Sequence, residues 1–385
     1  MKPNEPRSEH IKRIRERYTQ ADKRKKTVML TELCLTWNID RKHAIKLLNG
    51  KRGGPKKKAG RKPKYDDRLV RHITVLWDSM ERIHPKRIKA AIPIWLPFYR
   101  DPEFDLVLKS QLMKMSASTI ERFLNRGRKV IKGLSLTRRA KFFRYRIPLT
   151  NTNEKIINAG HVAADTVAHC GDNIAGTFAW SLTVTDRLTG WTENRALVNK
   201  RAKSVRNAMN SIEQYLPFKI KSIQTDCGTE FLNYLMMKYF QHRPAPVVMS
   251  RSRPYQKNDN AHVEQKNFTH VRECFGYERI EDLSVLSLMN EIYRDYWNPL
   301  HNFFLPQMQL LSKERIGSRI KKKHDFPKTP FERLKLAPNV SEEEKAKLEI
   351  RMKSLNPFEL KRALEQRLDL FFSLLKQGKN GKKAA

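Results

Sequence analysis

The pattern of apolar and polar positions is strand-like and then mixed in the middle of the chain. Runs of alternating apolar residues predict three β-segments, the last two joined by a turn at Asp186–Gly190. Helical and strand-like periods then alternate. The strand segments are 157–168, 176–190, 191–198, 218–226 and 245–254, and the helices are 200–216, 230–241 and 261–276. This order predicts an α/β core, which we assign to residues 156–297.

The amino-terminal residues follow a helical period instead. Residues 9–49 predict helices, with two short amphipathic pieces joined around Asn38–Asp40. The arrangement resembles a helix-turn-helix, whose second helix enters the major groove of DNA. An ordinary helical hairpin with a solvated basic face remains the alternative. We assign residues 1–50 to this domain, and its candidate DNA-binding side chains are Arg41, Lys42, His43 and Lys46.

A strongly basic linker follows at 51–65. Residues 51–64 contain eight Lys and Arg, no acid, three Gly and two Pro, a composition that cannot form a packed core. We expect it to contact phosphates or a narrow minor groove, the alternative being a nonspecific tether. The candidate contacts are Lys56, Lys57, Lys58, Arg61 and Lys62.

A second helical block is predicted at 66–133, followed by a basic connector at 134–155. In this block Ser118 and Glu121 have the spacing of a capping box. Asn and Arg read base edges with two hydrogen bonds, so the block is a second candidate DNA reader, although an ordinary surface helix fits the pattern too. The side chains expected to face DNA are Thr119, Arg122, Asn125 and Arg126.

The carboxyl-terminal region, 298–385, is predicted to be basic and mainly helical. Asn356 is a candidate cap, with Pro357 and Glu359 at the first and third helical positions. The following helix has one apolar stripe, which we expect to pack on its own chain. The stripe consists of Leu360, Leu364, Leu368, Phe371 and Leu375.

Charge identifies the class of partner. The 385 residues include 78 Lys and Arg against 40 Asp and Glu, a formal net charge of +38. Such an excess favours a polyanion, and we expect double-stranded DNA. Six Trp and eighteen Phe indicate packed cores, which argues against a small packaging protein.

The remaining composition concerns metals and location. The four Cys are widely scattered without a C-x-x-C pair, so no zinc site is expected. Free thiols fit a reducing compartment. No apolar run approaches the ~20 residues of a membrane span, and the amino terminus lacks the apolar core of a signal peptide. We therefore expect a cytoplasmic protein with no membrane partner.

Three acidic residues are placed poorly for packing and well for chemistry. Asp165 and Asp226 each end an apolar, β-like run, and Glu264 lies near the start of a helix-like stretch. Carboxylates are the hard oxygen ligands that Mg²⁺ and Mn²⁺ prefer. Three converging carboxylates can hold two ions, which suits phosphoryl transfer. Read separately, the three could be a turn residue, a helix cap and a solvated helix residue.

These segments resemble the catalytic core of the integrase-type transposases, which include retroviral integrases and many insertion-sequence transposases. The match covers roughly 157–280 and is strongest in "RPYQKNDNAHVEQKNFTHVR". Between Asp226 and Glu264 lie 37 residues, a couple more than in retroviral integrases, so Glu264 is assigned by its motif. The resemblance implies a ribonuclease-H-like core, with Asp165, Asp226 and Glu264 as catalytic metal ligands.

The segment around Glu264 supplies supporting residues. Asn260 and Asn267 share its helix face and could orient metal or DNA, while Lys257 and Lys266 could hold phosphate. The resemblance implies a transposase that binds its element's ends, cleaves phosphodiesters and joins 3′-hydroxyls to target DNA. Holding two ends requires a homo-oligomer on DNA. A metal-dependent nuclease that does not join, or a non-catalytic DNA-binding regulator, stays open.

Overall fold

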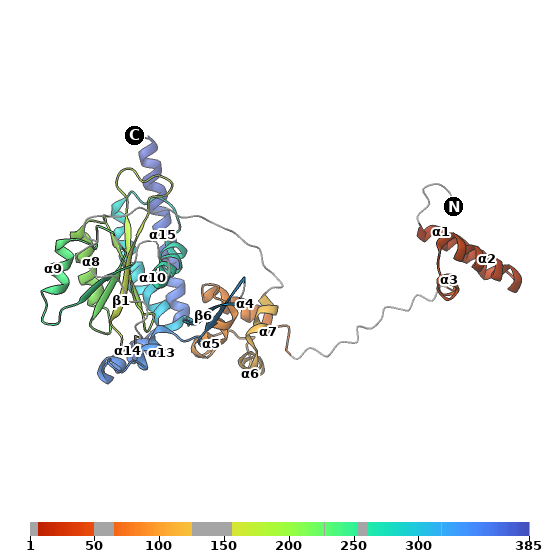
Figure 1. Ribbon diagram of the computed structural model, residues 1–385, viewed down its shortest axis with the longest axis horizontal. Helices are drawn as coiled ribbons and strands as arrows, with labels where there is room; N and C mark the ends of the chain where they lie inside the picture. The colour runs from red at the N-terminus through yellow and green to blue at the C-terminus, as the bar shows by residue number, and fades with distance from the viewer. Residues whose placement is uncertain are drawn as a thin grey trace. The chain divides into compact units, whose positions relative to one another are not determined.

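The structure is a computed structural model that describes residues 7–49, 65–124, 156–226, 228–252, 261–316 and 318–384. Two compact units divide after Lys64. The first is helical, and the second is mixed α/β (Figure 1). At this level the expected combination of an α/β core with helical regions is confirmed. Residues 51–64 and 134–155, most of the expected linker and all of the connector, lie outside the described residues.

The first unit is a small three-helix cluster. Its break falls where the sequence predicts, because Asn38 ends the second helix in a left-handed conformation with φ of 50°. The Asp40 side chain then accepts a hydrogen bond of 2.9 Å from the backbone N–H of His43 and starts the third helix. The helices are α1 (Arg7–Gln20), α2 (Lys23–Trp37) and α3 (Arg41–Leu48). Their core consists of Tyr18, Leu30, Leu33, Ala44 and Leu48.

The second unit begins with the predicted helical block. Its elements are α4 (Leu69–Ser79), α5 (Pro85–Trp95), the 3₁₀ turn η1 (Leu96–Phe98), α6 (Leu106–Lys114) and α7 (Ala117–Leu124). The predicted Ser118 cap is wrong. Ser116 Oγ instead accepts from the Thr119 backbone N–H at 3.2 Å, so the helix starts two residues earlier than expected. Ser116 offers the same hydroxyl, and the apolar face selects the earlier start by burying Ile120 and Leu124.

A five-stranded sheet follows, in the order β3-β2-β1-β4-β5. The pairs β1–β2 and β2–β3 are antiparallel, whereas β1–β4 and β4–β5 are parallel. The parallel pairs need crossovers, which α8 (Ala202–Glu213) and α9 (Tyr234–Gln241) provide. The strands are β1 (His161–Ala168), β2 (Trp180–Asp186), β3 (Thr192–Leu197), β4 (Ser222–Thr225) and β5 (Val248–Arg251).

Helices cover both faces of this sheet. Buried side chains of α8 and α9 form one apolar cluster with β1, β2, β4 and β5. A continuous helical segment contacts β1 and β2 and contains α10 (Ala261–Lys266), the π-helical turn η4 (Asn267–Arg272) and α11 (Glu273–Phe275). In Figure 1, α8 and α9 lie on one side of the sheet and α10 and α15 on the other. The sheet is therefore the central layer, with its strand ends left for a site.

A second helical segment and the carboxyl-terminal helix complete the layer of α10. The segment consists of η5 (Leu283–Val285), α12 (Leu286–Glu291), η6 (Ile292–Trp297) and η7 (Leu300–Phe304). The last helix, α15 (Pro357–Ala384), starts at the predicted cap, where Asn356 Oδ1 accepts from the Phe358 N–H at 3.0 Å. Its predicted stripe packs on the same chain, because Leu364 and Phe371 are fully buried in the large apolar cluster.

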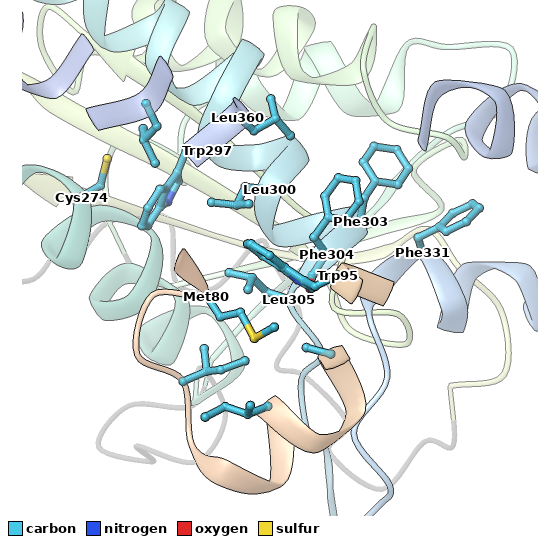
Figure 2. Close-up of a cluster of buried hydrophobic side chains, with 14 of the residues drawn as sticks. Met80, Trp95, Cys274, Trp297, Leu300, Phe303, Phe304, Leu305, Phe331 and Leu360 are labelled. Atoms are coloured by element: carbon cyan, nitrogen blue, oxygen red, sulfur yellow. The ribbon is translucent and has the colours of Figure 1, made fainter. Parts of the chain in front are cut away.

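The helical block and the α/β core share that cluster. Trp95 of α5 is fully buried, and its indole N–H donates to the Phe304 carbonyl at 2.8 Å. Figure 2 shows Met80 and Trp95 beside Leu300, Phe304 and Leu305. Residues 65–124 are thus packed against the core as part of one unit.

The carboxyl-terminal region also contains an unanticipated hairpin. Strands β6 (Leu310–Ile316) and β7 (Arg319–His324) form a separate antiparallel sheet. Helices α13 (Pro330–Lys335) and α14 (Glu342–Ser354) follow it. Within the described segments, no helix has both the length and the apolar character needed to cross a membrane.

Candidate active site

Two of the three predicted carboxylates meet at one edge of the sheet. Strands β1 and β4 are parallel neighbours, and Ala164 pairs with Thr225. Asp165 and Asp226 each follow directly after these paired residues. Because paired strands lie about 4.8 Å apart, the two aspartates are adjacent. Both are half-buried, so their charges influence each other more strongly than they would in open water.

Each aspartate is held by hydrogen bonds from its surroundings. Asp165 Oδ1 accepts from the backbone N–H of Thr166 at 2.8 Å, and its Oδ2 accepts from Asn267 Nδ2 at 2.7 Å. Asp226 Oδ1 accepts from the backbone N–H of Gly228 at 2.8 Å. The donors come from a strand, a helix and a loop, so the carboxylates are oriented by three different parts of the core.

The carboxylates also repel one another. Burial raises the pKa of Asp165 to about 8, and the charges of Asp226 and Glu230 add to the effect. The hydrogen bonds from Thr166 and Asn267 act in the opposite direction without overcoming it. Near neutral pH this arrangement favours either a proton on Asp165 or a cation beside it.

The third predicted carboxylate, Glu264, lies on α10, three residues before Asn267. The side chain of Glu264 is outside the described set, as are all atoms of Lys257 and Asn260. Asn267 links this helix to the aspartates through its bond to Asp165. The structure therefore brings the helix of Glu264 to the two aspartates.

Glu230 is a site residue that the sequence analysis missed. It is buried, and its Oε1 accepts from the Thr166 hydroxyl at 2.9 Å. Gly228 allows this approach, because a Cβ there would lie 2.6 Å from Glu230 Oε2 and 2.8 Å from Asp226 Oδ1. A signal was present in "DCGTEF", where an acid follows Asp226 by four residues and precedes a buried Phe.

Lys266 differs from the expected phosphate contact. Its ammonium group is buried and donates to Gln307 Oε1. Burial lowers its pKa to about 7, and the nearby cations Arg87 and Arg333 contribute. In this position Lys266 joins α10 to the segment after η7 and is closed to a phosphate. Its place beside Glu264 in the sequence gave no indication of this burial.

The oxygen donors present fit a hard divalent cation. Asp165, Asp226 and Glu230 provide carboxylates, and Asn267 Oδ1 is buried without a hydrogen-bond partner. An orphaned buried oxygen beside carboxylates is suited to a metal-bound water or an ion. Among the described side chains, which exclude Glu264, no three His, Cys, Asp or Glu are grouped closely enough to hold a metal ion.

The candidate DNA-binding residues divide by exposure. All four on α3, namely Arg41, Lys42, His43 and Lys46, are exposed. On α7, Arg122 is exposed, whereas Thr119 is buried and accepts from Arg122 at 3.1 Å, contrary to its expected exposure. The face of α7 that packs against α4 and α5 takes Thr119 inside. The other candidates lie outside the described residues, namely Lys56, Lys57, Lys58, Arg61, Lys62, Asn125 and Arg126.

Comparison with known proteins gives a relative and a weak structural similarity. No family model matches the chain. A chain of the simian T-cell lymphotropic virus intasome in complex with PP2A regulatory subunit B56 gamma is 12% identical, with a TM-score of 0.28, and the match covers 43% of this chain. This chain spans about half the length of that one, 54%.

The sequence relative extends over most of both chains. It is the uncharacterized protein y4rM of Sinorhizobium fredii (strain NBRC 101917 / NGR234), which is 31% identical over 336 residues. The match covers 85% of this chain and 94% of the relative. The chain therefore belongs to the same family as y4rM.

Proposed function

We propose that the protein is a DNA transposase of the integrase type, which cleaves phosphodiesters at the ends of its element and joins the 3′-hydroxyls to target DNA. One observation carries the proposal. Asp165 and Asp226 end adjacent parallel strands, and Asn267, from the helix of Glu264, donates to Asp165. Sequence placed these residues about a hundred and about forty positions from one another, and the fold brings them to one edge.

The sheet supports a ribonuclease-H-like core as the frame for this chemistry. Three antiparallel strands are followed by two parallel ones in the order β3-β2-β1-β4-β5. The site lies where β1 and β4 end, next to the helix segment that begins with α10. An edge formed by strand ends leaves side chains open to a substrate, while the helices on both faces keep those strands rigid.

Asp165, Asp226 and Glu264 would hold Mg²⁺ or Mn²⁺, two ions in the full site, with Glu230 close by. When bound, these ions supply charge neutralisation at the phosphate and activation of the attacking oxygen. The pKa of Asp165, raised to about 8 by burial and by Asp226, means that this carboxyl holds its proton until a cation replaces it.

The other side chains position the ligands. Asn267 Nδ2 orients Asp165, and its free Oδ1 is available to a water in the site. Glu230 accepts from the Thr166 hydroxyl and so fixes the strand residue next to Asp165. Gly228 donates its N–H to Asp226 and gives the carboxylates room.

DNA is the proposed substrate and partner, bound as a homo-oligomer that holds two ends. The net charge of +38 supports a polyanionic partner. The basic linker at 51–65 would contact phosphates, and α3 presents Arg41, Lys42 and Lys46 on its exposed face. Helix α3 would read the major groove in the manner of a helix-turn-helix.

A strand-transfer assay with a pre-cleaved DNA end tests the proposal. The full chain should join the labelled end to target DNA when Mg²⁺ is added. Asp226→Asn and Glu264→Gln should each abolish joining while binding the same duplex nearly as well as the unaltered chain. Asp172→Asn, at an exposed loop position, is the matched control and should keep full joining.

The other outcomes separate the alternatives. Cleavage of an intact end without joining would indicate a nuclease. Binding without either reaction, in a protein whose fold is verified, would indicate a regulator. Near-normal joining by Asp226→Asn would remove the assignment of the site.

A further inference from the structure

We propose that the β6–β7 hairpin inserts into a groove of double-stranded DNA and grips its phosphates next to the candidate active site. The inference deepens the proposed function and rests on it, since it names a DNA contact for a DNA transposase. The sequence analysis assigned DNA contacts to residues 1–133 alone.

The hairpin has the form of a projecting ribbon. Its register runs from Ile316 opposite Arg319 to Leu310 opposite His324, and β6 and β7 pair only with each other among the described strands. Ile316 and Ile320 are 60% and 55% exposed, so they stabilise no core. A two-stranded ribbon is marginally stable by itself in water, and exposed apolar side chains near its turn are suited to a partner that covers them.

Its charge selects the partner. Residues 310–324 contain six Lys and Arg and a single acid, Glu314. Lys321, Lys322 and Lys323 are exposed, and none forms an ion pair with a described side chain. Side chains alternate along a strand, so Lys321 and Lys323 lie on one face and Lys322 on the other.

Cations on both faces of a narrow ribbon fit a groove between two rows of phosphates. The major groove of DNA is about 12 Å wide and admits a two-stranded ribbon. The apolar side chains near the turn can contact base edges such as the thymine methyl group. An acidic protein surface lies on one side of a ligand only, so it would leave one face of these lysines unpaired.

The base of the hairpin is fixed to the core near the site. Gln307 and Lys328 exchange backbone hydrogen bonds of 2.8 and 3.1 Å, and Arg333 pairs with Asp325 at 2.6 Å. Lys266 of α10 donates to the side chain of Gln307. Lys266 adjoins Asn267, which binds Asp165, so two consecutive residues of one helix connect to the hairpin base and to the carboxylates. DNA held by the hairpin would therefore lie close to the reacting groups.

The first experiment measures the salt dependence of DNA affinity. The full chain is titrated with a fluorescent random-sequence duplex over a range of salt concentrations. The combined Lys321→Ala, Lys322→Ala and Lys323→Ala variant should flatten the log–log slope by about two to three units, at roughly 0.9 per phosphate released. The control removes the same charge from α14, where each lysine already pairs with a glutamate. It combines Lys345→Ala, Lys347→Ala and Lys353→Ala, and its slope should stay at the wild-type value.

The second experiment is a direct contact test. A photo-crosslinking amino acid replaces Ser318, which is exposed at the turn of the hairpin. Irradiation with the duplex should give a covalent protein–DNA product. The same amino acid at Ile350, exposed on α14, should give little.

Each result has a defined meaning. Equal slopes for the hairpin and control variants, without a crosslink at Ser318, would overturn the inference. A protein–protein crosslink at Ser318 with an unchanged slope would also overturn it, and would make the hairpin a contact between copies. Joining of a pre-cleaved end is scored separately, so retained Mg²⁺-dependent joining alongside a negative hairpin result leaves the proposed function intact.

Discussion

Replacing Asp165 with Asn should stabilise the metal-free protein at high pH. Its pKa rises from 3.8 to about 8 in the folded state, mainly through burial, with the charge of Asp226 adding. Each pKa unit corresponds to about 1.4 kcal/mol, so the ionised carboxylate lowers the free energy of unfolding by up to about 6 kcal/mol at pH 9. The folded state binds the extra proton, so wild-type stability should fall as pH rises from about 4 to about 8.

The Asn side chain recovers part of that energy. It carries no charge, but its single oxygen can accept from only one of the two donors that Asp165 now binds, Thr166 N–H and Asn267. Losing one charge-assisted hydrogen bond costs about 1.5–3 kcal/mol. The expected net gain for Asp165→Asn at pH 9 is therefore about 3 kcal/mol. At pH 5, where folded Asp165 is protonated, the variant should be no more stable than the wild type.

Urea unfolding with a chelator, followed by tryptophan fluorescence, measures this difference. Five of the six Trp lie in the second unit, so the signal reports mainly on the unit that holds the site. Adding Mg²⁺ should stabilise the wild type at pH 9 and have a much smaller effect on Asp165→Asn. Asp172→Asn, at an exposed position, should follow the wild type throughout. Identical pH dependence in the wild type and Asp165→Asn would refute the reasoning.

Three other substitutions have defined outcomes. Gly228→Ala would put a Cβ 2.6 Å from the Glu230 carboxylate, so Mg²⁺-dependent joining should fall at least about tenfold in a protein that still folds, as circular dichroism can verify; unchanged joining would contradict the described approach. Trp95→Ala removes a fully buried side chain and its bond to Phe304, so urea unfolding should show a loss of about 3–5 kcal/mol, whereas a loss below about 1 kcal/mol would mean that the helical block is not packed on the core. Removing the charge of the linker should flatten the salt dependence of DNA affinity by several units, and an unchanged slope would show that the linker does not touch DNA. The linker variant replaces Lys56, Lys57, Lys58, Arg61 and Lys62 with Ala.

Local chemistry made much of the fold predictable from sequence. The break at Asn38–Asp40 and the start of α15 at Asn356 depend on side chains that bond backbone groups within three residues. Strand and helix periods are likewise set by near neighbours, which is why the order of the elements through the core was predicted. Asp165 and Asp226 could be singled out because acids that end apolar strands contribute nothing to a core.

Only the tertiary structure decided which side chains meet. Glu230 joins Thr166 across 64 positions, and Lys266 is buried against Gln307, because neither contact follows from a local period. An apolar helix face is the same in sequence whether it packs within its own block or on another. Trp95 accordingly gave no indication that residues 65–124 share a core with Phe304, about two hundred positions away. Sequence sets the local conformation and supplies the reactive groups, whereas long-range burial determines their neighbours and therefore their charge state.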